Sequence, residues 1–305
     1  MKRFKNIWIF SDSIAGHEIQ SVSLAEQLSD NVSIHHCTIR QPWLSFAPRR
    51  LPRFGRNIIW KSSQPNLSQS VDVIITCGRR MAAVGKHFKK LLQCIHIQIL
   101  NPGDGVEKYD LLICPEHDNQ KGRNILSIKG SLHPISTQFL SNFDCSKISQ
   151  QSVGLFLGNP FSKFFEQLES MKQQIAQSFP EHHVYVCGSR RTPKSESNRI
   201  RKVFSNSRNV WLGDDDGENP YLSMLTCCEV LVVTADSINM VSEACAIDKN
   251  VIVIAESEAS PKHQRFIHSI KERLSTFEQL KSDVEPLETL NKLTKQVLNF
   301  FSENP

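Results

Sequence analysis

The chain has 305 residues, of which 39% are apolar, and its formal net charge is +5. This length is enough for two ordinary domains with a core each, and the modest positive charge favours an anionic partner without specifying one. No run of about 18 apolar residues occurs, and the opening MKRFKNIWIF reaches Ser11 and Asp12 without the pattern of a signal peptide. We therefore expect a cytoplasmic protein without a membrane-spanning helix.

Short apolar runs alternate with helix-length segments, which is typical of parallel strands covered on both faces. The expected strands occupy residues 6–10, 32–39, 71–77, 94–100 and 110–115, and then 152–158, 182–188, 209–213, 230–235 and 250–255. The pattern restarts near residue 150, after the polar segment SNFDCSKISQQS, which we interpret as a linker. The sequence thus predicts an α/β fold of two Rossmann-like, doubly wound domains with parallel sheets, at residues 1–145 and 150–280.

The last segment, residues 281–305, predicts a separate amphipathic helix. Its apolar residues fall on one side of the helix: Leu287, Leu290, Leu293, Val297 and Phe301. Such a helix covers either its own domain or the first one, and the sequence leaves both arrangements open.

Polar or glycine-bearing loops follow nearly every expected strand, at the edge where open α/β sheets bind ligands. After the first strand, SDSIAGH offers Asp12 and His17 as candidate general bases toward a hydroxyl. Gly16 lies at the start of the next helix, where free N–H groups favour an anion. In the competing interpretation, Asp12 or Ser13 only caps the helix and His17 is a surface residue.

Paired arginines follow a strand in each half of the chain. Arg79 and Arg80 stand at a strand-to-helix turn and are candidates for phosphate binding, with solvated surface arginines as the alternative. A similar group in the second half could hold a diphosphate: Ser189, Arg190, Arg191 and Thr192. Asn219 and Tyr221 flank a proline that would start a helix facing the ligand.

The sequence shows no clear metal or cofactor site. The acidic turn GDDDGENPY lacks a separate third carboxylate, and the histidine pairs at 35–36 and 182–183 would point to opposite faces of a strand. The nine cysteines show neither metal spacing nor a disulfide framework. We expect buried, reduced thiols and no cofactor.

Residues 40–61 differ in kind from the rest of the chain. Arginines and a lysine alternate there with aromatic residues, Trp43, Phe46, Phe54 and Trp60, and three prolines disfavour a regular core element. This mixture suits an anionic membrane interface, with an ordinary basic loop as the alternative. No nucleic-acid-binding module surrounds these residues, so we expect peripheral contact with the inner face of a membrane and no nucleic-acid partner.

Several of these motifs together resemble a known family. ITCGRRMAAVGK, HIQILNPG, DLLICPEHD, GSLHPIS, SRRTP, GENPY and VVTADSINMVSEA occur in the order seen in the mitochondrial fission (elongated mitochondria) family and its bacterial members. The resemblance implies a GT-B-like glycosyltransferase fold, with two Rossmann-like domains facing a cleft. Two loops depart from the family pattern, because Ser11 and His17 replace a glycine and an asparagine, and LGNPFS is poorer in glycine than usual.

The resemblance also implies a function and further site residues. Glu243 would bind the ribose of a nucleotide-sugar, and Asp236, Ser237 and Ser242 would lie near its sugar or phosphates. Ser237 would cap a helix in the same place, which is compatible with ligand binding. We expect a metal-independent, bacterial-type glycosyltransferase that moves a sugar from a nucleotide-sugar to a lipid-linked or other membrane-associated acceptor. A non-enzymatic adaptor and a nucleotide-sugar epimerase of the same fold are the alternatives.

Overall fold

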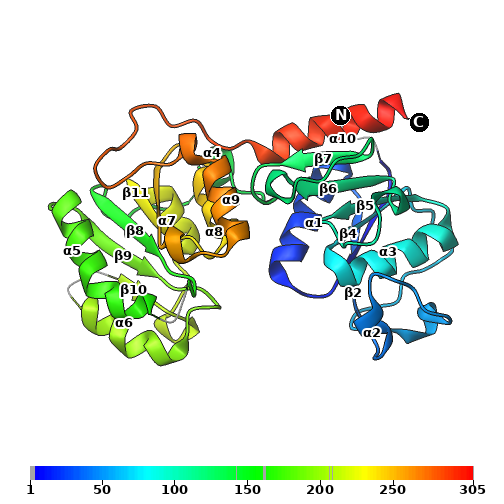
Figure 1. Cartoon of the computed structure of the whole chain (residues 1–305), viewed down its shortest axis with the longest axis horizontal. Helices are drawn as coiled ribbons and strands as arrows, with labels where there is room; N and C mark the ends of the chain where they lie inside the picture. Colours follow the sequence, from blue (N-terminus) through cyan, green and yellow to red (C-terminus); the bar gives the residue numbers. More distant parts are fainter. Residues whose placement is uncertain (1–3, 142, 161–162, 206, 208, 305) are drawn as a thin grey trace. The chain divides into compact units, whose positions relative to one another are not determined.

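The computed structural model describes residues 4–141, 143–160, 163–205, 207 and 209–304. The chain forms two compact units, one of Met1–Pro134 with Thr289–Pro305 and the other of Ile135–Glu288. Each unit is a β-sheet with helices on its faces (Figure 1).

The first unit is built on a seven-stranded sheet with the order β3-β2-β1-β4-β5-β6-β7. Neighbouring strands are parallel, except that β3 runs antiparallel to β2. The strands span Ile7–Ser11 (β1), Val32–Ile39 (β2), Ile58–Trp60 (β3), Val73–Cys77 (β4), Ile95–Ile99 (β5), Leu111–Pro115 (β6) and Ile125–Ile128 (β7). The helices are Ala15–Leu28 (α1), Trp43–Phe46 (α2), Gly78–Leu92 (α3) and Thr289–Glu303 (α10).

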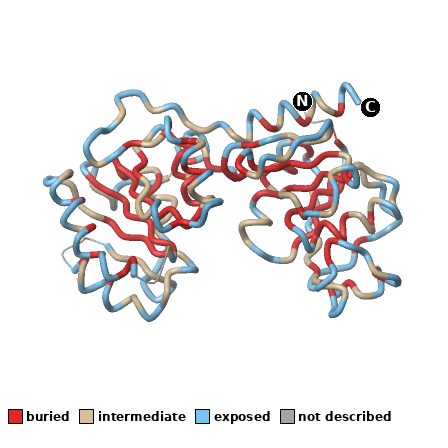
Figure 2. The backbone as a smooth tube through the Cα atoms, viewed as in Figure 1, coloured by how far each residue is buried: buried red, intermediate tan, exposed pale blue. Residues whose placement is uncertain are grey.

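Both faces of this sheet are covered because the central strands are apolar on both sides. On one face, Ile7 and Ile9 of β1 pack with Leu24 of α1 and Val297 of α10. On the other face, Trp8 and Phe10 of the same strand pack with residues of α3 and of the segment before β3. The buried residues accordingly follow the strands of each unit in Figure 2.

The second unit has a five-stranded sheet with the order β10-β9-β8-β11-β12, and all its neighbouring strands are parallel. The strands span Ser152–Phe156 (β8), His183–Cys187 (β9), Asn209–Trp211 (β10), Val230–Thr234 (β11) and Asn250–Ile254 (β12). The helices are Thr137–Leu140 (α4), Leu168–Ser178 (α5), Ser197–Val203 (α6), Tyr221–Cys227 (α7), Ile238–Cys245 (α8) and Pro261–Ser269 (α9). Helices α5 and α6 cover one face of the sheet, and α7, α8 and α9 cover the other.

The expected α/β fold with parallel sheets is confirmed, and every apolar run predicted as a strand contains one. The edge strands β3 and β7 were not foreseen. The first unit ends at Pro134 rather than at residue 145, because Ile135, Leu140 and Phe143 pack into the core of the second unit. The C-terminal helix begins at Thr289 and belongs to the first unit, where Leu293, Val297 and Phe301 join the core.

Two expectations about side chains are wrong. A disulfide joins Cys145 to Cys227 at the end of α7, so these two cysteines are not thiols, whereas the other seven form no disulfide. Within residues 40–61, Phe54 is buried in the core, so its ring is not available to a membrane. Trp60 is half-buried and packs against Phe10 and Phe88. Phe46 is exposed. In the part of the chain that the structure describes, no helix has the length and apolar character needed to cross a bilayer.

Candidate functional site

In the first unit, the candidate residues lie where the strand order reverses between β1 and β4. The loop after β1 carries Asp12, and Gly78 directly follows β4. These strands are neighbours, but the chain leaves them toward opposite sides of the sheet. Such a switch point leaves an opening at the carboxyl ends of the strands, which is where α/β sheets bind ligands.

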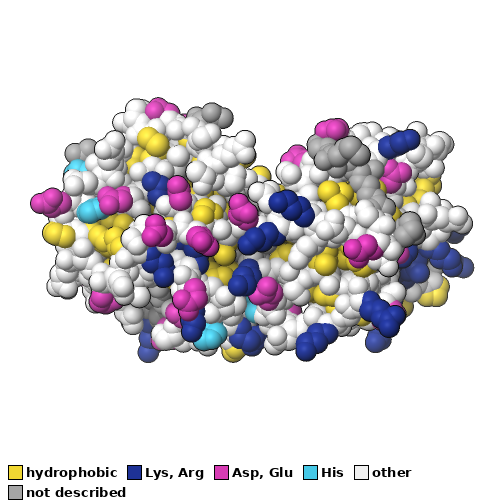
Figure 3. All heavy atoms as spheres, turned by 90° about the horizontal axis from the view of Figure 1, so that it is seen from above, with side chains coloured by type: hydrophobic (Ala, Val, Ile, Leu, Met, Phe, Trp, Pro, Cys, Tyr) yellow, Lys and Arg dark blue, Asp and Glu magenta, His cyan; other side chains and the backbone are white. Residues whose placement is uncertain are grey.

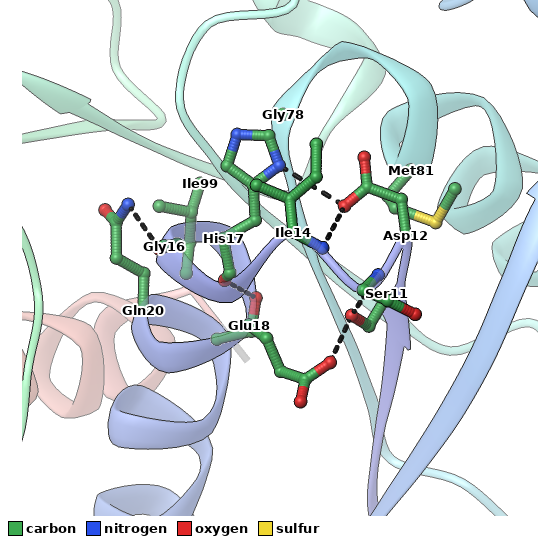
Figure 4. Close-up of polar contacts among 12 residues, drawn as sticks. Ser11, Asp12, Ile14, Gly16, His17, Glu18, Gln20, Gly78, Met81 and Ile99 are labelled. Atoms are coloured by element: carbon green, nitrogen blue, oxygen red, sulfur yellow. Dashed lines mark hydrogen bonds and ion pairs between the residues drawn. The ribbon is translucent and has the colours of Figure 1, made fainter. Parts of the chain in front are cut away.

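The Asp12 carboxylate and the His17 imidazole face each other across this loop (Figure 4). Asp12 Oδ1 lies 3.4 Å from His17 Nδ1. The same oxygen accepts a hydrogen bond from the Ile14 N–H at 3.3 Å, which holds the carboxylate in the loop. The Asp12 side chain is 5% exposed and that of His17 is 27% exposed. A ligand can therefore reach His17, while Asp12 is placed to orient it.

The surroundings of Asp12 keep its carboxylate ionised. Burial raises the pKa of Asp12, but the hydrogen bond and charge of His17, the Ile14 N–H and the charge of Arg80 outweigh burial, so the pKa lies below its ordinary value. An ionised carboxylate accepts a hydrogen bond from the Nδ1–H group of the neighbouring imidazole. The favoured tautomer of His17 therefore leaves the lone pair of Nε2 available as a base.

Gly78 leaves the space in which the His17 ring lies. A Cβ atom on Gly78 would be 2.7 Å from His17 Cε1, and the backbone there has a φ of +77°, which favours glycine. The carbonyl of Gly78 accepts a hydrogen bond of 3.3 Å from the buried amide of Gln98 on β5. The position of His17 thus depends on a turn that β5 supports from within the sheet.

Glu18 and His36 form a second polar pair beside the first, and the sequence analysis missed both. Glu18 Oε2 accepts a hydrogen bond from Ser11 Oγ and lies 2.8 Å from His36 Nε2. The register of β1 and β2 places Ser11 opposite His36. The position of Glu18 next to His17 could have drawn attention to it, whereas His36 requires knowledge of the strand pairing.

The other residues expected around this site have different roles. Arg79 donates to the backbone carbonyls of Ala47 and Ser45, so its guanidinium fixes the segment around α2 and is not free to bind phosphate. Arg80 is exposed, and its charge acts on Asp12. Gly16 lies in the first turn of α1, where an α-helix has no internal carbonyl partner for its N–H groups.

The second unit has an equivalent switch point between β8 and β11. The Gly158 N–H donates to Thr234 Oγ1 at 2.8 Å, and the Asn159 N–H donates to Asp236 Oδ2 at 3.0 Å. A Cβ atom on Gly158 would clash with the Asp236 carboxylate. The loops after the two strands are therefore locked together, and Asp236 lies at their centre.

Arg191 connects a third loop to these two. Its guanidinium lies 3.1 Å from Asp236 Oδ2 and donates to the Asp236 carbonyl at 3.1 Å. Thr192 Oγ1 accepts a hydrogen bond from the Ser189 N–H and donates one to the Leu157 carbonyl, at 2.8 Å in each case. The group predicted after β9 thus meets Asp236, and the neighbouring Arg190 is exposed.

Tyr221 and Glu243 form a half-buried pair beside the end of β8. The Tyr221 hydroxyl donates to Glu243 Oε2, and the tyrosine ring packs against Phe156 at 5.2 Å between centroids. Burial raises the pKa of Glu243, and the hydrogen bond from Tyr221 offsets only part of that effect. Asn219 Oδ1 accepts from the Tyr221 N–H at 2.9 Å and so shapes the start of α7.

The remaining expected residues have structural partners. Ser237 caps α8 by accepting from the Met240 N–H, as the structural interpretation allowed. Ser242 is buried and bonds to the Ile238 carbonyl within the same helix, so its hydroxyl is directed into α8. In the acidic turn, Asp216 makes hydrogen bonds of 2.6 and 2.7 Å to Arg201.

His263 on α9 is a neighbour of this site that the sequence analysis did not identify. Burial lowers the pKa of His263, and the charge of Asp236 opposes this effect while the charge of Arg191 adds to it. His263 Nδ1 lies 2.5 Å from Ser260 Oγ, the residue that caps α9. No motif signals this histidine, because α9 begins beyond the last strand of the sheet.

Two comparisons of the sequence with known proteins confirm the family resemblance. The family described as Mitochondrial fission ELM1 matches residues 15–301. The uncharacterized protein RP120 of Rickettsia prowazekii (strain Madrid E) is 24% identical over 315 residues, which covers 88% of this chain and 88% of that protein. The mitochondrial fission protein ELM1 of Arabidopsis thaliana is 24% identical over 238 residues, which covers 66% of this chain and 55% of that protein.

The fold is similar to that of solved structures along nearly the whole chain. A co-structure of S. aureus MnaA with UDP has a TM-score of 0.53 at 12% identity and covers 99% of this chain and 97% of that chain. The UDP-GlcNAc 2-epimerase from Neisseria meningitidis bound to UDP-GlcNAc has a TM-score of 0.53 at 11% identity, with 98% and 100% covered. A glycosyltransferase from Rickettsia africae ESF-5 has a TM-score of 0.51 at 12% identity, with 98% and 88% covered. These likenesses concern the fold, and the expected GT-B-like fold is confirmed.

Proposed function

We propose that this chain, which belongs to the Mitochondrial fission ELM1 family, is a glycosyltransferase that moves a sugar from a nucleotide-sugar to an acceptor hydroxyl. The Asp12–His17 pair is the observation that carries this function. A carboxylate held ionised beside a partly exposed imidazole, at a switch point of the sheet, is an arrangement suited to general-base chemistry. The likeness of fold to a glycosyltransferase and to proteins bound to UDP or UDP-GlcNAc supports the substrate class.

In the proposed reaction, His17 is the general base. Asp12 accepts a hydrogen bond from Nδ1–H and holds the ring, while Nε2 removes the proton from the acceptor hydroxyl. The acceptor oxygen attacks the anomeric carbon of the donor sugar, the bond from that carbon to the phosphate oxygen breaks, and the nucleotide leaves with the bonding electron pair. The N–H groups at the start of α1, near Gly16, offer positive partial charge to an anionic group at this end of the helix. Glu18 and His36 support the same loop through Ser11.

The second unit would bind the donor. Arg190 is exposed, and Arg191 is 51% exposed although it contacts Asp236, so both can approach a diphosphate. Asp236 Oδ1 accepts no hydrogen bond from any residue that the structure describes, which leaves it an acceptor for a sugar hydroxyl. Glu243 would accept hydrogen bonds from the ribose hydroxyls in place of the one that it accepts from the Tyr221 hydroxyl.

The acceptor would be lipid-linked or otherwise membrane-associated. Support comes from the cations of residues 40–61, of which Arg49, Arg53 and Arg56 are exposed, and from the exposed ring of Phe46. Since the other rings of this segment are buried or packed, charge rather than aromatic insertion would dominate the contact.

Donor binding is tested by calorimetry with UDP-sugars and other nucleotide-sugars on the full chain. Glu243→Gln should bind a matching donor at least about tenfold more weakly, because it loses charged acceptors for the ribose hydroxyls. His268→Gln, an exposed change on α9, should bind it normally. Equal binding by Glu243→Gln would remove Glu243 from the donor site, and binding of no nucleotide-sugar would instead favour the non-enzymatic adaptor.

Catalysis is tested with the donor that binds, by measuring release of its nucleotide. His17→Gln should lower turnover on the order of 10²–10⁴-fold with little change in donor affinity, since general-base catalysis contributes that much. Asp12→Asn should give a smaller loss, because it leaves the imidazole in place but removes the charge that orients it. Normal turnover in both variants would contradict the assignment of this pair.

A further inference from the structure

A groove in the first unit concentrates positive charge away from the Asp12–His17 pair. It is lined by residues 49–56, by the second half of α3, and by two residues of the connection between β5 and β6. Its cationic side chains are Arg49, Arg50, Arg53, Arg56, Lys86, Lys89, Lys90 and Lys108. Lys and Arg side chains gather on part of the first unit's surface in Figure 3. Only the fold brings these segments together.

The groove is more positive than the chain as a whole. Eight cations and the single carboxylate of Asp104 give +8 − 1 = +7, whereas the full sequence carries +5, so all residues outside the lining sum to −2. Like charges at this density repel one another and destabilise the folded state unless an anion neutralises them. The net positive charge of the protein thus comes from the lining of this groove.

The carboxylate of the groove is already neutralised by its neighbours. Asp104 is 4% exposed, pairs with Lys86, and lies 3.6 Å from Lys108 Nζ. The Tyr109 hydroxyl also donates to Asp104, at 2.6 Å. Lys89 is paired with Asp110 at 2.7 Å. Asp104 and Asp110 thus form ion pairs with Lys86 and Lys89. Four other cations of the groove are exposed: Arg49, Arg53, Arg56 and Lys90.

Contacts between residues 49–56 and α3 fix the shape of the groove. Arg50 donates to the Lys86 carbonyl at 3.0 Å and joins residues 49–56 to α3. A Cβ atom on Gly55 would be 2.6 Å from His87 Nε2, so the loop touches the helix where it has no side chain. Phe54 anchors the same loop in the core and is 4% exposed.

We propose that this groove is a binding site for a ligand with clustered phosphate groups. Arginine forks and lysine ammonium groups from three segments converge on one hollow, which is the chemistry that recognises several phosphates at once. The aromatic ring of Phe54 is buried, so the lining does not offer it for the base stacking that single-stranded nucleic acids use. The groove contains none of the residues assigned to donor binding or to the Asp12–His17 pair. Its ligand is either a soluble polyphosphate or the phosphate headgroups of an anionic bilayer, and in the second case the groove is the membrane contact that the proposed function places in residues 40–61.

The test uses the full chain and a variant that removes three exposed cations of the groove: Arg49→Gln, Arg56→Gln and Lys90→Gln. The matched control, Lys121→Gln with Arg123→Gln and Lys129→Gln, removes the same charge from exposed positions of the same unit outside the groove. One arm measures binding of inorganic tripolyphosphate by calorimetry. The other measures co-sedimentation with phosphatidylglycerol vesicles, against phosphatidylcholine vesicles, at low and high salt.

We expect the groove variant to lose affinity about fivefold per cation, or on the order of a hundredfold in total, while the control stays near the wild type. A loss confined to tripolyphosphate identifies a soluble ligand, and a loss confined to phosphatidylglycerol identifies a membrane surface. High salt should weaken either interaction. Equal losses in groove variant and control, or no binding in either arm by the wild type, would overturn the proposal. Donor binding by the second unit is a separate readout and fails independently.

Discussion

At Gly78 the absence of a side chain determines where His17 lies. The Gly78→Ala variant should keep the fold but push the imidazole away from Asp12, because the new Cβ would lie 2.7 Å from His17 Cε1. The hydrogen bond and charge of His17 help to lower the pKa of Asp12, so that pKa should rise in the variant. The measurement is the ¹³C titration of the Asp12 carboxyl by NMR.

Gly103→Ala is the matched control for this change. Gly103 has a φ of +81°, similar to the +77° of Gly78, but a Cβ there meets nothing within 4 Å. Both variants should lose about 1–2 kcal/mol for a left-handed alanine, and only Gly78→Ala should alter the Asp12 titration. An unchanged Asp12 pKa in both would show that Gly78 does not set the position of His17.

His96 belongs to the buried polar group that supports the Gly78 turn. Gln98 Nε2 donates to backbone carbonyls, so its Oε1 must accept a hydrogen bond from the Thr76 hydroxyl. The Thr76 oxygen then accepts from His96 Nε2, at 2.7 Å, which places a proton on Nε2. Burial first, and then the charges of Lys89 and Lys86, lower the pKa of His96 to about 3.

This histidine should make the fold sensitive to acid. Between an unfolded pKa of 6.5 and a folded pKa of about 3, the unfolded state binds a proton at His96 that the folded state does not. Stability therefore falls as the pH drops through this window, by about 1.4 kcal/mol per pH unit. In urea titrations, the free energy of unfolding of the wild type minus that of His96→Gln should fall at this rate as the pH drops below 6.5. Parallel pH profiles of the two proteins would contradict a neutral His96.

Local sequence was enough to find Asp12 and His17, because both lie in one loop after an obvious strand. It could not reveal that Arg79 holds a loop, since its carbonyl partners, Ala47 and Ser45, are more than a helix away in sequence. His263 and His36 were missed for the same reason, because their neighbours at the sites come from other segments of the chain. A site whose residues lie in one loop can be predicted from the sequence, whereas a site assembled from several segments cannot.

Among the helices, α10 shows how an amphipathic pattern leaves its partner undetermined. The pattern predicted the helix and its buried side, but Leu293 and Val297 pack into the core of the first unit, next to residues of α1 and β1. Both faces of the first unit's sheet are apolar, so α10 completes a layer that α1 alone does not cover.

Leu293→Ala should therefore destabilise the first unit. Leu293 is fully buried, and truncating such a leucine costs about 2–5 kcal/mol. Hydrogen exchange should become faster in β1, β4 and β7, with little change in β8 and β11. Gln296→Ala, on the exposed side of the same helix, should leave exchange unaltered in both units. Faster exchange confined to the second unit would contradict the assignment of α10.

The strands that the sequence did not predict are both at edges of the first sheet. In β3 only Ile58 is buried while Ile59 is exposed, and β7 contains the exposed Ser127. An edge strand is buried on fewer sides, so it need not show the apolar run that marks a central strand. The disulfide was equally hidden, because Cys145 and Cys227 are separated by 82 residues and share no spacing pattern.

Across the whole molecule, both units use the same principle to place polar groups. Each sheet reverses its strand order once beside its first strand, at β1–β4 and at β8–β11, and each reversal holds an aspartate, Asp12 or Asp236. The sequence predicted this repetition from alternating runs and polar loop ends. It could not place the groove of the first unit, which requires residues 49–56 and α3 to meet in space.

The return of α10 to the first unit has a consequence for how the protein is made. The chain leaves the first unit at Pro134, builds the whole of the second, and returns only at Thr289. The second unit is contiguous, so it can complete its core as soon as its own residues have left the ribosome. The first unit, although synthesised first, must wait with an uncovered apolar face until α10 emerges. The half of the protein that holds the Asp12–His17 pair is thus the last to complete its core.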